Sequence, residues 1–131
     1  MQAIGKINHR FNQIGYRPKF GNLAFNDLSR ALMPDETILN VVEGSIKSTV
    51  GVVIATDLRV FYVGVDKRIN PALQQISYDD ISEVKVNNGL FVSVELTIKT
   101  KSGNELIIKG CDQDRAQEMI ELINLLVKEK N

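Results

Sequence analysis

The residues that could perform chemistry in this sequence are few and far apart. His9 is the single histidine and Cys111 the single cysteine. A nucleophilic thiol needs a nearby base, and a zinc site needs three or four nitrogen or sulfur ligands, so neither chemistry is expected. One cysteine also excludes a disulfide within the chain. We interpret Cys111 as a buried thiol at the end of a strand.

The acidic side chains do not suggest a catalytic pair either. Asp79 and Asp80 are adjacent, so on a strand they would point to opposite faces. The segment DQDRAQ at 112–117 begins like a calcium-binding loop, but Ala116 and Gln117 stand where an oxygen ligand and a glycine are needed. The sequence contains no glycine-rich phosphate loop. It therefore predicts no enzyme, no metal site, no cofactor and no small-molecule substrate.

Basic side chains form the main electrostatic feature. Residues 1–26 carry Lys6, Arg10, Arg17 and Lys19 and no acid, whereas the whole chain has 16 basic and 16 acidic residues and a formal net charge of zero. Such a balance gives no overall field to attract nucleic acid. The side chains that could contact an anion or a lipid headgroup are Lys6, Arg10, Lys47, Lys67 and Arg68. For those in loops, the alternative is an ordinary solvated charge.

An amphipathic helix is expected near the N-terminus. Ile4, Ile7, Phe11 and Ile14 follow one another at steps of three, four and three, which places them on one helical face. This candidate partner face could pack on its own domain, dock on another subunit or protein, or lie on an anionic membrane. The segment GYRPKFG that follows predicts a linker. We therefore divide the chain into a basic helix with its linker, residues 1–21, and a main domain, residues 22–131.

A second helix is expected to begin at a capping Asn22 and to end at or before Met33, because Pro34 follows. Its apolar face would consist of Phe25, Leu28, Ala31 and Leu32.

From Thr37 onward the sequence predicts strands. Two apolar runs in GVVIATDLRVFYVG, residues 51–64, predict a hairpin whose turn is held by the Asp57 side chain. Two short strands flank Asp79 and Asp80, and the turn NNG at 87–89 leads into the alternating strand LFVSVELTIKT, residues 90–100. ELIIKG at 105–110 completes a count of about seven strands.

The last element is a predicted helix with Asp112 as its N-cap. Its apolar stripe consists of Ala116, Met119, Ile120, Ile123 and Val127. The sequence thus indicates an α+β domain in which a curved antiparallel sheet or partly open barrel is closed by this helix.

The order of these motifs resembles the bacterial PH-like domains, with the YokE-type branch nearest and the GRAM domains more distant. One match is Pro34-Asp35-Glu36 before the first strand. The others are Gly51, Thr56 and Arg59 in the hairpin and Tyr78, Ile81 and Val84 at the following corner. The likeness covers about residues 23 to 127.

This resemblance implies a seven-stranded bent sandwich capped by the C-terminal helix, and no catalysis. It also argues against specific inositol phosphate binding, because the loop EGSIKST, residues 43–49, offers only Lys47 with Glu43 close by. Arg59 is expected to pair with Asp57 or with the corner at 79–80 rather than with an anion.

Together these patterns predict a non-catalytic PH-like module that self-associates or binds another protein. The alternative is a peripheral membrane module that binds anionic lipid through the basic helix and the loop cations. The longest apolar run is far shorter than the roughly 20 residues that span a bilayer, and no signal peptide is evident, so a cytoplasmic location is expected.

Overall fold

The computed structural model describes residues 1–18, 22–46, 49–64, 75–88 and 93–130. The loop cations Lys47, Lys67 and Arg68 and part of the predicted 87–89 turn therefore lie outside the described residues. The elements are α1 (Ile4–Gln13), α2 (Asn22–Ala31), β1 (Ile38–Ile46), β2 (Thr49–Thr56), β3 (Arg59–Gly64), β4 (Gln75–Ser77), the 3-10 turn η1 (Tyr78–Asp80), β5 (Ile81–Asn87), β6 (Glu95–Thr100), β7 (Glu105–Lys109) and α4 (Gln113–Lys130).

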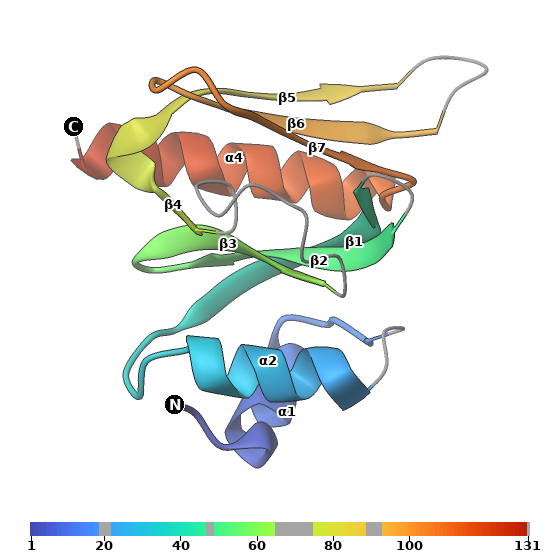
Figure 1. The fold of residues 1–131 in the computed structure, drawn as a ribbon, viewed down its shortest axis with the longest axis vertical. Helices are drawn as coiled ribbons and strands as arrows, with labels where there is room; N and C mark the ends of the chain where they lie inside the picture. The colour runs from blue at the N-terminus through green and yellow to red at the C-terminus, as the bar shows by residue number, and fades with distance from the viewer. Residues whose placement is uncertain (19–21, 47–48, 65–74, 89–92, 131) are drawn as a thin grey trace.

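The seven strands form one antiparallel sheet in the order β4-β3-β2-β1-β7-β6-β5. Within the described residues, β1 and β7 pair only at Ser45 and Lys109, and the sheet opens there into two halves. Figure 1 shows α4 lying between the two halves, while α1 and α2 lie on the other side of β1–β3. The α+β bent sandwich with a C-terminal helix and N-terminal helices is thus confirmed.

Two hydrophobic clusters lie on opposite faces of β1–β3. The inner cluster fills the space around α4 and includes Val53, Leu96, Met119 and Ile123. The outer cluster joins β1–β3 to the N-terminal helices and consists of Ile7, Phe11, Tyr16, Leu28, Leu32, Ile38, Val41, Val52, Ile54, Phe61 and Val63.

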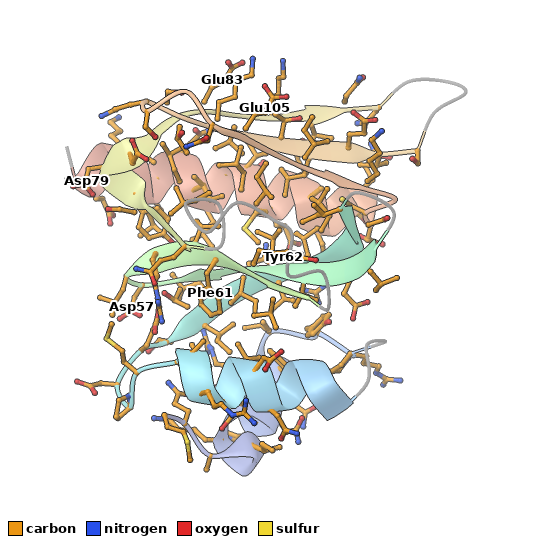
Figure 2. All side chains as sticks on the ribbon, viewed as in Figure 1. Asp57, Phe61, Tyr62, Asp79, Glu83 and Glu105 are labelled. Carbon is orange, nitrogen blue, oxygen red and sulfur yellow. The ribbon has the colours of Figure 1, made fainter. Side chains whose placement is uncertain are left out.

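This double coverage explains the unbroken apolar runs in the 51–64 hairpin. Side chains alternate across a strand, so Phe61 belongs to the outer cluster and Tyr62 to the inner one. Figure 2 shows Phe61 on the α2 side of the sheet and Tyr62 on the α4 side. A strand covered on both faces needs apolar residues at every position.

Two glycines in this hairpin make room for the Tyr62 ring. Gly51 and Gly64 are paired across β2 and β3. A Cβ atom on Gly51 would lie 2.4 Å from the ring, and one on Gly64 would lie 2.0 Å from the tyrosine oxygen. The close approach of the ring, rather than an unusual backbone angle, requires glycine at both positions.

Several local predictions need correction. Ala31 is exposed rather than on the buried face of α2. Of the strand predicted at 90–100, residues 90–92 lie outside the described residues, and residues 93 and 94 precede β6 rather than belong to it. The β2–β3 turn is held by the Thr56 hydroxyl, which accepts hydrogen bonds from the amides of Leu58 and Arg59. Asp57 instead accepts a hydrogen bond from the Thr37 amide at 2.8 Å.

The start of α4 agrees with the sequence. Asp112 accepts a hydrogen bond from the Arg115 amide at 3.0 Å, which is an N-cap contact. In the predicted stripe, Ala116, Met119 and Ile123 are buried, and the other two members pack against the same cluster.

Candidate functional site

Among the described side chains, the most buried ion pair joins the β2–β3 turn to the segment before β1. Arg59 donates to both carboxylate oxygens of Glu36, from Nε to Oε2 and from Nη2 to Oε1, each at 2.9 Å. The Glu36 side chain is 0% exposed and that of Arg59 12%. The expected partners of Arg59, Asp57 or the 79–80 corner, were therefore wrong, because Glu36 occupies the guanidinium in a bidentate contact.

Neighbouring groups complete this network. The Thr56 hydroxyl donates to Glu36 Oε2 at 2.6 Å, and the Tyr78 hydroxyl donates to the Thr56 carbonyl. Burial raises the pKa of Glu36, but hydrogen bonds from Arg59, Thr56 and the Met33 amide lower it by more, so the net pKa lies below the ordinary value. Burial also raises the pKa of Tyr78, and the charges of Asp57 and Glu36 raise it further.

The network connects four parts of the chain. Arg59 also donates to the Gln75 side chain and to the Ala31 carbonyl, each at 2.6 Å. One guanidinium thereby connects the end of α2, the loop at 36, the β2–β3 turn and β4. The Arg59 donors and the Glu36 oxygens contact each other. Neither the guanidinium nor the carboxylate is therefore directed at a ligand.

The single histidine and the single cysteine do not meet. Cys111 lies in the inner cluster and donates a hydrogen bond to the Ile108 carbonyl at 3.2 Å. Burial raises the pKa of its thiol. His9 is exposed on α1, on the other side of the sheet (Figure 1). The geometry offers this thiol no imidazole base.

The acidic residues singled out in the sequence hold turns. Ser77 donates to Asp79 at 2.5 Å, and Ser102 donates to Asp80 at 3.2 Å. These two aspartates stand in η1 rather than on a strand. Among the described side chains, no group of three or more His, Cys, Asp or Glu residues gathers as a metal site would require.

The N-terminal helix packs on its own chain. Ile7 and Phe11 are buried in the outer cluster, Ile14 packs against it, and Ile4 is 42% exposed. The cations of α1 also contact the chain itself: Lys6 donates to the Pro34 carbonyl at 2.7 Å and Arg10 to the Ile38 carbonyl at 2.6 Å.

An open groove of about 560 Å³ lies where β1 and β7 diverge. No sequence motif predicts it. Within it, Tyr16 donates to the Glu43 carboxylate, and Arg115 donates to the Gly15 carbonyl at 2.6 Å and to Asn40 at 3.2 Å. Glu43 was predicted in a loop but belongs to β1. Burial raises the pKa of Tyr16, and its bond to Glu43 adds to the rise. Glu43 and Arg115 are therefore bonded to other groups of the fold. The wide separation of these residues along the chain explains why no motif revealed the groove.

The sheet edges are the remaining candidates. β4 and β5 are the terminal strands of the sheet; β4 has three residues and β5 seven. The outer face of β5–β7 carries a charge ladder in which Lys99 contacts Glu83 at 3.8 Å and Glu105 at 3.9 Å. Figure 2 shows Glu83 and Glu105 on the side of these strands away from α4.

No helix in the described part of the chain is long and apolar enough to cross a membrane. A comparison with curated protein sequences finds no match. Among solved structures, the chain resembles the C-terminal domain of an unknown protein from Leishmania infantum. The TM-score is 0.54 at 16% sequence identity, over 80% of this chain and 93% of that one. This likeness supports the fold.

The family comparison is more specific. A family model described as a bacterial PH domain matches residues 32–125. The match includes Glu36, Thr56, Arg59 and Tyr78, the four residues of the buried network, and begins at the end of α2. Domains of this family are generally non-catalytic interaction modules. With its sheet, capping helix and matched residues in agreement, the chain belongs to the bacterial PH domain family.

Proposed function

We propose that this protein is a non-catalytic interaction module that self-associates or binds another protein. The observation that carries the proposal is the β5 edge, which is seven residues long and, within the described residues, paired only with β6. Unpaired backbone donors and acceptors on a sheet edge can accept a strand from another chain.

The polar side chains described above already have partners inside the fold, which supports an interaction through the β5 edge. Glu36, Arg59, Tyr16 and Arg115 contact partners inside the fold, and Lys6 is bound to a backbone carbonyl. A partner strand bound through backbone groups and complementary surface charges would not need these five side chains. It also fits the zero net charge, which keeps copies of the chain from repelling one another strongly.

The test of self-association is the mass of the full-length protein in solution. We expect light scattering across micromolar concentrations to give a mass above that of one chain, rising with concentration. The mass of a single chain throughout the range would contradict self-association.

Binding to anionic lipid is the alternative, and it would depend on Lys47, Lys67 and Arg68, since Lys6 and Arg10 donate to backbone carbonyls. We expect no salt-sensitive cosedimentation with vesicles that contain phosphatidylglycerol. Salt-sensitive binding that is lost when those three residues are replaced by glutamine would favour the membrane function instead.

A further inference from the structure

We propose that β5 pairs antiparallel with β5 of a second copy, about a two-fold axis through Val84, to form a closed dimer. This inference rests on the proposed self-association and assigns it a surface and a register.

The β5 edge presents two different faces. Val84 and Val86 are half-buried and pack against the inner cluster beside α4. Glu83 and Lys85 alternate with them and are exposed on the outer face. Two copies related by an axis perpendicular to the sheet would keep their α4 helices on one side and their charged residues on the other.

The positions of these charges select one register. Side chains that are directly opposed across the two copies must lie on the same face of the sheet. The two-fold axis must therefore pass through a residue, not between two residues. An axis through Glu83 opposes two carboxylates, and an axis through Lys85 opposes two ammonium groups. An axis through Val84 opposes Glu83 to Lys85 of the second copy and Lys85 to Glu83 of the second copy.

The same register also gives the longest overlap, because Val84 is the middle residue of Ile81–Asn87. The strand is therefore self-complementary in charge and in length. Opposite charges directly across an antiparallel pair stabilise it, and like charges destabilise it. A parallel pairing in register would bring like charges side by side, so the same pattern disfavours open-ended stacking.

The pairing would extend an existing ladder. Within one chain, Glu105, Lys99 and Glu83 alternate in sign across β7, β6 and β5. Lys85 of the second copy would occupy the next position beside Glu83. The centre of the joined sheet would run β7-β6-β5-β5-β6-β7. Both β5 edges would be used, so association through this edge stops at the dimer.

The test uses charge reversal in the full-length protein. We expect Glu83→Lys alone and Lys85→Glu alone each to raise the dimer dissociation constant about tenfold or more, because each creates two like-charge pairs. The double variant E83K/K85E restores both opposite pairs and should dimerise like the unmodified protein. An equimolar mixture of the two single variants should form a mixed dimer, since each supplies the charges that the other lacks.

Glu105→Lys is the matched control. It removes the other carboxylate beside Lys99, at 3.9 Å, without altering the β5 edge, so its dissociation constant should stay unchanged. If the unmodified protein associates but E83K has no larger effect than E105K, the β5 register is wrong while self-association stands. If the unmodified protein is monomeric throughout, self-association itself fails.

Discussion

Single residues contribute very unequally to the stability of this fold. Among the described ion pairs, Glu36 and Arg59 form the one whose loss should lower the free energy of unfolding most. Both side chains are almost fully removed from water, and their two parallel hydrogen bonds offset the cost of that removal. Losing one partner would leave the other as a buried charge without a counterion. The cost of a substitution here should therefore far exceed that at an exposed ion pair.

Replacing Arg59 by leucine tests this point. We expect the free energy of unfolding, measured with urea and circular dichroism, to fall by about 3–5 kcal/mol, because Glu36 would remain buried and unpaired. Arg30→Ala is the control, since that arginine contacts Asp27 at 3.7 Å with 73% of its side chain exposed. Its effect should stay within about 0.5 kcal/mol. Similar losses in both variants would contradict the assignment of Arg59.

The same pair predicts an acid-sensitive contribution to stability. Hydrogen bonds hold the folded-state pKa of Glu36 below its ordinary value despite burial, so folding favours the ionised carboxylate. Its contribution is complete above the unfolded pKa of about 4.3 and is lost as the pH falls through the lower folded-state pKa. The stability difference between the unmodified protein and Glu36→Gln should therefore be constant near neutral pH and shrink in acid. A difference that grows in acid would reverse the sign that we assign.

At the scale of the elements, the β1–β3 unit is unusual in being buried on both faces. Consecutive residues of one strand belong to different clusters: Val41 packs outward under the N-terminal helices and Val42 inward against the α4 side. The outer face needs a cover because its side chains are apolar. α1 and α2 supply that cover, although the family match begins only at residue 32.

Phe11→Ala tests whether α1 belongs to the core. Phe11 is 1% exposed and meets the Tyr16 ring edge-on at 4.8 Å, so the truncation should lower the free energy of unfolding by about 3–5 kcal/mol. His9→Ala, an exposed change on the same helix, should have almost no effect. An equally small effect of Phe11→Ala would mean that α1 contributes little to the folded state.

The sequence predicts the strands where a local pattern of apolar and polar residues specifies them. It does not predict the side-chain contacts between residues that are far apart in the chain. The hairpin at 51–64 follows from two apolar runs around a polar turn. Those same runs also contained the signal for a cover on both faces, since a strand with one solvated face would alternate. Nothing local revealed the partner of Arg59, because Glu36 lies 23 residues earlier and Asp57 is closer in sequence.

For the whole molecule, we propose that the layers unfold as one cooperative unit, whereas the boundary expected after residue 21 stays a prediction. The N-terminal helix packs on the rest of the chain, and the residue Gln2 before it adds polar contacts. The Gln2 side chain donates to the carbonyls of Met33 and Glu36, and Ser29 donates to the Gln2 carbonyl. The β1–β3 strands connect this layer to the inner core. A loss of stability on one side should therefore spread to the other.

Hydrogen exchange of the full-length protein tests this coupling. Ile123 lies in the inner cluster on α4, far from α1 in the layer order (Figure 1). If α1 exchanges only when the whole molecule unfolds, Ile123→Ala should reduce the protection of α1 amides by the same free energy as that of α4 amides, about 2–5 kcal/mol. If α1 opens independently, the same substitution would leave its protection unchanged. That outcome would support the boundary expected after residue 21 and would make the apolar outer face of the sheet accessible in the native state.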